Sequence, residues 1–177
     1  MRALLLCSAL LLSGTDTALA IDSTGLVVRI LDGDTIEVLH NRQPERIRLS
    51  GIDCPEKGQP FGQKAKHAAS ALLFAKEVTL HTHGKDKYRR TLADVLLSDG
   101  TNVNTVLVAG GWCWWYPKYA RQNKELKRLE SEARAAKRGL WADPYPVPPW
   151  EWRKRGRASS TSHFFAGSDV SGVGSTG

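Results

Sequence analysis

Residues 26–49 read LVVRILDGDTIEVLHNRQPERIRL and contain three strand-like segments separated by two turns. The first segment is apolar and β-branched, and Asp32-Gly33-Asp34 supplies a turn before residues 35–39 alternate in strand fashion. After a second turn the chain alternates again, with Ile47 and Leu49 on one face and Arg46 and Arg48 on the other. This stretch therefore predicts a three-stranded meander.

The segments that follow complete a barrel pattern. Residues 61–76 carry apolar side chains at helical spacing, and residues 77–83 and 91–97 return to strand character. A short helix near Val103 and a charged helix at residues 123–137 come next. Five short strands with a helix inserted after the third predict an α+β, mainly β, protein: a five-stranded OB-fold Greek-key barrel with three α-helices, a fold that often binds nucleic acid.

The composition describes one globular domain. The chain has 177 residues, of which 41% are hydrophobic and 24% are charged. This composition is too apolar for wholesale disorder, and the chain is too short for two large domains. Its formal net charge of +7 favours a polyanionic partner, either nucleic acid or an anionic membrane surface.

Both ends of the chain differ in composition from this domain. Residues 1–20 have an apolar run and end in Ala18-Leu19-Ala20, which predicts a signal peptide cleaved after Ala20. The alternative, a membrane anchor, would need a run of about 20 residues. We therefore expect an exported protein, periplasmic or secreted, with no stable membrane insertion. Residues 153–177 are basic and then Gly/Ser-rich, which predicts a disordered tail after a domain at 21–152.

Export would leave Cys54 and Cys113 as the only cysteine pair, because Cys7 lies in the predicted signal peptide. An oxidising compartment permits a disulfide between them. Two separate, partly buried thiols are the alternative, and the sequence leaves both open.

Acidic and basic residues gather at the predicted turns. Residues 32–34 form the tip of the first hairpin, and Asp53-Cys54-Pro55-Glu56 follows the third strand. Hard cations such as Ca²⁺ are bound by carboxylate and carbonyl oxygens from loops of this kind. Arg48 and the basic segment 85–90 could neutralise phosphate oxygens, so the set matches what attack on a phosphodiester requires. Taken singly, each piece is typical of an ordinary turn or a solvated strand face.

The order of these motifs resembles the staphylococcal nuclease (thermonuclease) family over about residues 25–142. The motifs that carry the resemblance are Asp32-Gly33-Asp34-Thr35, Arg48-Leu49, Ile52-Asp53-x-Pro55-Glu56, Asp86-Lys87-Tyr88-x-Arg90 and Leu140-Trp141. The resemblance implies an OB-type barrel and a Ca²⁺-dependent endonuclease that acts on DNA and RNA and releases 3′-phosphate ends.

The resemblance also implies roles for individual residues. Asp34, Asp53 and the backbone carbonyl of Cys54 would bind the metal, and Glu56 would activate or orient the attacking water. The phosphate would be gripped by two arginines, Arg48 and Arg90. Two positions depart from the family pattern: Cys54 replaces a small residue, and Arg89 replaces a glycine beside Arg90.

All six tryptophans lie between Trp112 and Trp152. Stacking of a base on an aromatic ring is worth about 1 to 3 kcal/mol, so some of these side chains are candidates for substrate binding. The candidates are Tyr88, Trp114, Trp115 and Tyr116. Packing in the core is the alternative for Trp114, Trp115 and Tyr116, and it is favoured for the other tryptophans.

A second function class is a non-catalytic OB-fold module that only binds nucleic acid, as in degenerate repeats of this family. Such repeats typically lack the carboxylates or arginines, whereas this chain retains all five matching side chains: Asp34, Arg48, Asp53, Glu56 and Arg90. A cationic, envelope-associated protein is a third class, but it leaves the acidic turns unexplained. We expect an enzyme that is a monomer.

Overall fold

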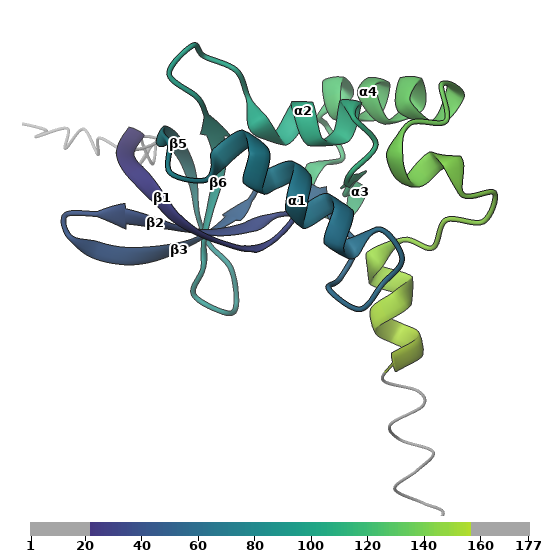
Figure 1. Ribbon diagram of the computed structural model, residues 1–177, viewed down its shortest axis with the longest axis horizontal. Helices are drawn as coiled ribbons and strands as arrows, with labels where there is room; N and C mark the ends of the chain where they lie inside the picture. The colour runs from purple at the N-terminus through teal and green to yellow at the C-terminus, as the bar shows by residue number, and fades with distance from the viewer. Residues whose placement is uncertain (1–21, 157–177) are drawn as a thin grey trace, which may run out of the picture.

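The computed structural model describes residues 22–156 and contains a closed five-stranded barrel (Figure 1). Its strands follow the order β1-β2-β3-β6-β5 around the barrel. Only β3 and β6 pair in parallel within it; the other neighbours are antiparallel. The bounds are β1 Asp22–Asp32, β2 Thr35–His40, β3 Gln43–Leu49, β5 Glu77–Lys85 and β6 Thr91–Leu96. The predicted barrel, including the meander of its first three strands, is confirmed.

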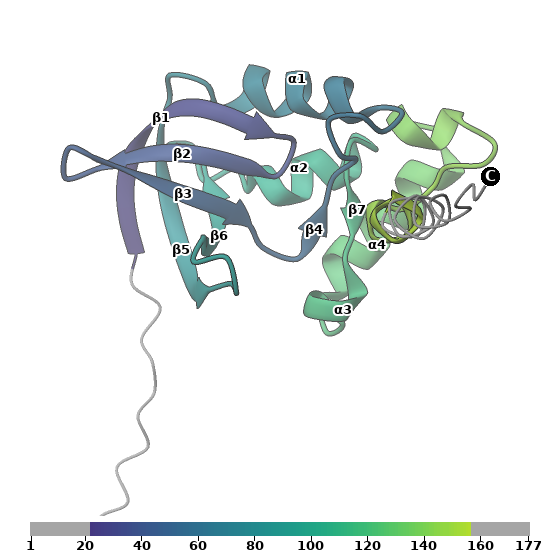
Figure 2. The same cartoon turned by 90° about the horizontal axis from the view of Figure 1, so that it is seen from below.

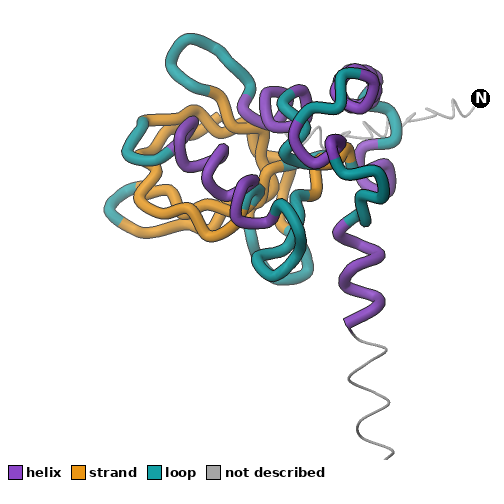
Figure 3. The backbone as a smooth tube through the Cα atoms, turned by 45° about the vertical axis from the view of Figure 1, so that its right-hand side comes forward, coloured by secondary structure: helices purple, strands orange, loops and turns teal. Residues whose placement is uncertain are grey.

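One helix lies across the barrel strands, and the other helices lie beside the barrel (Figure 1 and Figure 3). The three that the sequence predicted are α1 Gly62–Leu73, α2 Val103–Ala109 and α4 Lys124–Ala135. The structure adds elements that the sequence did not predict: the short helix α3 Pro117–Ala120, the 3₁₀ helix η1 Gly139–Ala142, a helix at 149–156, and a small sheet of β4 Ile52–Asp53 and β7 Trp114–Trp115.

The barrel interior is filled by alternating strand residues, among them Ile36, Val38 and Ile47, all with 0% exposure. Helix α1 contributes small buried side chains, Ala65 and Ala69, so that its backbone can lie close to the barrel. This packing places the loop that precedes α1 beside the tip of the β1–β2 hairpin.

A disulfide joins Cys54, just after β4, to Cys113, just before β7. The structure therefore forms the bridge that the sequence left open. Figure 2 shows β4 leading from the barrel toward β7, and the disulfide lies beside this pairing. It ties the loop after β4, which carries Glu56, to the segment that follows α2.

The chain is ordered beyond the expected domain boundary. Residues 153–156, assigned to the tail on composition, continue the helix that begins at residue 149. The remaining predicted tail, 157–177, and the predicted signal peptide lie outside the described residues. Within residues 22–156, no helix is both long enough and apolar enough to span a bilayer.

Replacing both cysteines, as in the double variant Cys54→Ala and Cys113→Ala, tests the contribution of the disulfide. The bridge closes a loop with a sequence separation of 59, and loss of such a bridge should cost about 2 to 4 kcal/mol because the unfolded chain gains freedom. We expect the thermal midpoint, followed by circular dichroism, to fall by on the order of 10 °C. The thermal midpoint of the wild-type protein should fall by a similar amount under reducing conditions. Equal midpoints of the wild type with and without reductant would contradict the prediction.

Candidate active site

Asp34 lies at the tip of the β1–β2 hairpin and is fixed by three bonds. Its Oδ2 accepts a hydrogen bond from the backbone N–H of Cys54 at 2.7 Å, and its Oδ1 accepts one from the hydroxyl of Thr35 at 3.0 Å. Its carbonyl accepts from the N–H of Leu49 at 2.9 Å. Gly33 permits this approach, because a Cβ there would lie 2.9 Å from the Cβ of Cys54.

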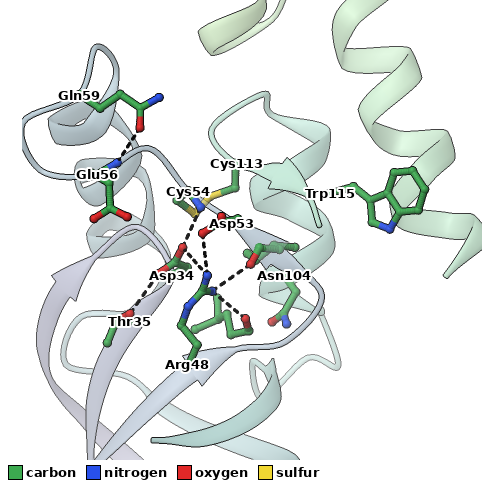
Figure 4. Close-up of a disulfide and its surroundings, with 12 residues drawn as sticks. Asp34, Thr35, Arg48, Asp53, Cys54, Glu56, Gln59, Asn104, Cys113 and Trp115 are labelled. Carbon is green, nitrogen blue, oxygen red and sulfur yellow. Dashed lines mark hydrogen bonds and ion pairs between the residues drawn. A yellow bond between two sulfur atoms is a disulfide. The ribbon is translucent and has the colours of Figure 1, made fainter. Parts of the chain in front are cut away.

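Arg48 projects from β3 between the two carboxylates that the resemblance assigned to the metal (Figure 4). Its Nη2 lies 2.9 Å from Oδ1 of Asp53 and 3.1 Å from Oδ2 of Asp34. Its Nη1 donates to the carbonyls of Leu49 at 3.0 Å and Ile52 at 2.9 Å. The side chain is only 11% exposed, so the guanidinium is held in one place by four acceptors.

Asp53 carries a carboxylate with 1% exposure. Burial raises the pKa of the Asp53 carboxyl above its ordinary value, and the guanidinium groups of Arg153 and Arg48 act in the opposite direction. A buried carboxylate is strongly destabilising unless it is paired, so these cations are part of what allows Asp53 to stay at the site in its charged form.

Glu56 lies in the loop between β4 and α1, and its side chain is 38% exposed. Its N–H donates to Oε1 of Gln59 at 3.2 Å, and its carbonyl accepts from the N–H of Gln59 at 2.8 Å. Gly62 begins α1 directly against this loop: a Cβ there would lie 1.9 Å from the carbonyl oxygen of Glu56. The backbone of Glu56 is therefore fixed, whereas its carboxylate reaches solvent.

Arg90 reaches the site from the loop between β5 and β6. Asp86 shapes this loop, because its Oδ1 accepts from the N–H groups of Tyr88 at 2.8 Å and of Arg90 at 3.0 Å. Its Oδ2 accepts from Nε of Arg90 at 2.8 Å. The Nη1 of Arg90 lies 3.4 Å from the hydroxyl of Thr35, the residue next to Asp34. Arg89, at the position where the resemblance implies a glycine, adopts a left-handed φ of 64°, a conformation that glycine favours.

The electrostatics of this loop follow from the same contacts. Partial burial tends to raise the pKa of the Asp86 carboxyl, but the hydrogen bonds from Arg90 and Tyr88 outweigh it and hold the pKa below its ordinary value. Asp86 therefore stays ionised well into acid and keeps Arg90 paired. The sequence motif contained Asp86, but sequence reasoning gave it no role.

Arg153 is a second residue that sequence reasoning missed. Its Nη2 lies 2.7 Å from Oδ2 of Asp53, and its Nη1 lies 2.6 Å from Oε1 of Glu56 and 3.2 Å from Oδ1 of Asp53. The basic run at residues 153–157 led us to assign Arg153 to the tail. A signal was present in Pro148-Pro149, because proline is favoured in the first turn of a helix.

Two of the predicted metal ligands converge, since Oδ2 of Asp34 and Oδ1 of Asp53 both contact one nitrogen of Arg48. Oxygen donors of this kind are what Ca²⁺ prefers, so the residues present fit a hard divalent cation. Within residues 22–156, no group of three or more His, Cys, Asp and Glu side chains could hold a metal ion. Backbone carbonyls, for which Cys54 stays the prediction, and water would have to complete the shell.

The predicted aromatic platform divides into core and surface. Trp114 is 5% exposed and packs edge-on against Trp141 and Trp150, so it is a core residue and not a platform for bases. Trp115 is partly buried and donates its indole N–H to the carbonyl of Ala120 at 2.9 Å.

Of the two candidate tyrosines, Tyr88 is exposed, whereas Tyr116 packs against other rings. Tyr116 is partly buried and stacks in parallel on Trp150 with ring centroids 5.1 Å apart. Tyr88 is 68% exposed, with the guanidinium of Arg90 5.5 Å from its ring centroid. Base stacking stays a prediction for Tyr88, Trp115 and Tyr116.

A small β-barrel with carboxylates and arginines converging at one end favours an enzyme that cleaves phosphodiesters. Comparison with known proteins agrees. Residues 46–143 match the family model described as staphylococcal nuclease homologue. A protein of Escherichia coli O157:H7 named uncharacterized endonuclease is 47% identical over 137 residues, covering 77% of this chain and 89% of its own. A micrococcal nuclease of Shigella flexneri is 42% identical over 142 residues, which cover 75% of this chain and 82% of the relative.

The chain belongs to the staphylococcal nuclease family and is a nuclease.

Asp86→Asn should reduce nuclease activity, because it removes the charge that aims Arg90. We expect kcat/KM on a single-stranded DNA to fall by about 10- to 100-fold, the cost of a small misplacement of a catalytic group. Asp99→Asn is a matched control, since Asp99 also accepts a turn N–H, that of Thr101, but faces no arginine of the site. Equal activity of the two variants would show that Asp86 does not position Arg90.

Proposed function

We propose that this nuclease is an exported, Ca²⁺-dependent endonuclease that hydrolyses phosphodiester bonds of DNA and RNA and leaves 3′-phosphate ends. The observation that carries the proposal is the convergence of Asp34, Asp53 and Glu56 with Arg48 and Arg90, which come from four different segments of the chain. The family uses metal ions in catalysis, and the oxygen donors of the site favour Ca²⁺.

The side chains have separate tasks in this reaction. Arg90 lies partly exposed beside Thr35, and its N–H groups would pair with phosphate oxygens and stabilise charge in the transition state. Arg48 adds positive charge from its buried position between Asp34 and Asp53. A bound Ca²⁺ would further stabilise the charge that develops on the phosphate oxygens. The carboxylate of Glu56 is exposed enough to accept a proton from the attacking water.

Water adds to phosphorus in this step, and the bond from phosphorus to the 5′ oxygen breaks. The proton given up by water passes to Glu56, and the leaving oxygen takes up a proton from bulk solvent to become a 5′-hydroxyl. The phosphate then stays on the 3′ end of the other fragment, as the resemblance to the family implies.

The proposed Ca²⁺ dependence and the role of Glu56 can be tested together. Purified protein should cut single-stranded DNA and RNA with Ca²⁺ and stop when a chelator is added. Glu56→Gln should lower kcat by at least about 100-fold, because the general base is lost. Glu77→Gln, at an exposed position on β5, should be unaffected.

Four outcomes would contradict this proposal. Cleavage that persists in chelator would contradict the dependence on a metal ion. Restoration of cleavage by Mg²⁺ but not by Ca²⁺ would contradict the assignment of Ca²⁺. Full activity of the Glu56→Gln variant would contradict the role of Glu56 as the general base. Binding of DNA without cleavage by the wild type would instead favour the non-catalytic module.

Export is supported by the Cys54–Cys113 disulfide, since such bridges persist in oxidising compartments. Expression of the full chain in a Gram-negative host should yield a protein that begins at Ile21 and fractionates with the periplasm or the medium. N-terminal sequencing and fractionation measure this. An intact N-terminus on a protein retained in the cytoplasm would contradict the predicted signal peptide.

A further inference from the structure

Arg153 enters the candidate site from a part of the chain about 100 residues away from its partners. Its guanidinium contacts both oxygens of Asp53 and Oε1 of Glu56, at 2.6 to 3.2 Å. Hydrogen bonds between charged groups in this geometry are among the strongest that side chains make. Of the side chains considered so far, Arg153 alone bridges the buried carboxylate of Asp53 and the exposed carboxylate of Glu56.

Helix 149–156, which carries Arg153, is anchored by aromatic contacts and through the loop that holds Glu56. Trp150 stacks on Tyr116 and packs edge-on against Trp114. In that loop, Nε2 of Gln59 donates to the carbonyl of Val147 at 2.6 Å. The Nε2 and Oε1 of Gln59 thus join the segment before this helix to the backbone of Glu56. The position of Arg153 is therefore built into the packing of the domain.

The contact has a clear physical effect on Glu56. A glutamate side chain that is 38% exposed has several rotamers open to it, and fixing one requires a directional partner. A planar guanidinium with two oxygens of Asp53 on one edge provides such a partner, because Asp53 is itself buried and immobile. The distance between the cation-binding carboxylate and the water-activating carboxylate is then set by one side chain.

We propose that Arg153 is a positioning residue of the nuclease site, which holds the Glu56 carboxylate at a fixed place relative to Asp53 for attack on the phosphodiester. The inference rests on the proposed function and adds a third arginine to the site. Arg48, on β3, forms an ion pair with Asp53. Arg153, on helix 149–156, pairs with both Asp53 and Glu56 and so links the two carboxylates.

Two other roles would predict different kinetics. A guanidinium on Asp53 could compete with the cation, in which case removing it would tighten Ca²⁺ binding and speed cleavage. Arg153 could instead bind substrate phosphate directly, in which case removing it would raise KM and leave kcat unchanged. A positioning residue acts on the chemical step, so its loss should lower kcat with little change in KM.

The test compares Arg153→Met, Arg153→Lys and the control Lys154→Met. Lys154 lies next to Arg153 on the same helix, is exposed and pairs with Glu151, so the control removes a charge without touching the site. The readouts are kcat and KM on a single-stranded DNA with Ca²⁺, and the affinity for Ca²⁺ alone, measured by isothermal titration calorimetry.

We expect Arg153→Met to lower kcat about 10- to 100-fold, with KM and Ca²⁺ affinity within about threefold of the wild type. Arg153→Lys should recover part of the lost kcat, since it keeps the charge but not the planar fork. Unchanged or faster cleavage by Arg153→Met, a Ca²⁺ affinity raised tenfold or more, or a change in KM alone would overturn the proposal.

A double-mutant cycle separates this inference from the proposed function. If the wild-type protein cleaves no nucleic acid, the proposed function fails. The coupling between Arg153 and Glu56 can still be measured from the thermal unfolding midpoints of Arg153→Met, Glu56→Gln and the double variant. Non-additive shifts in the midpoints support the contact between Arg153 and Glu56, and additive shifts overturn it.

Discussion

The buried guanidinium of Arg48 is the interaction on which the site depends. Asp34 and Asp53 come from different turns, and both carboxylates are almost fully buried, so without a cation between them they would repel each other and stay desolvated. Arg48 compensates both charges and also satisfies the carbonyls of Leu49 and Ile52, which binds the hairpin tip to β4. Arg48 thereby joins the hairpin tip, the end of β3 and β4 at the candidate site.

The remaining charges are supplied from loops and helices outside this centre. Arg90 is aimed by Asp86, and Arg153 is aimed by the aromatic packing of helix 149–156. The carboxylates of Asp34, Asp53 and Glu56 thus lie close to the guanidinium groups of Arg48, Arg90 and Arg153, although the chain as a whole is basic. The excess positive charge of the protein favours a polyanion in general, whereas this local arrangement distinguishes a site that cuts a phosphodiester from one that only attracts it.

The loop that carries Glu56 is held from several directions at once. The disulfide fixes its start at Cys54, the close approach of Gly62 fixes its end, and Gln59 links its backbone to the segment before helix 149–156. A rigid backbone with a solvent-exposed carboxylate suits a general base, because the group must be placed accurately and still reach water. Residues far apart in the sequence cooperate in this placement.

The sequence alone determined the features that local periodicity encodes: the meander at residues 26–49, the five-stranded barrel and the order of the motifs around Asp34, Arg48, Asp53 and Glu56. These depend on alternation and turn chemistry, which act over a few residues. Tertiary structure decided the rest. Trp114 is buried, and Arg153 belongs to the site instead of a tail, because both outcomes depend on packing between segments about 40 to 100 residues apart, which no local pattern records.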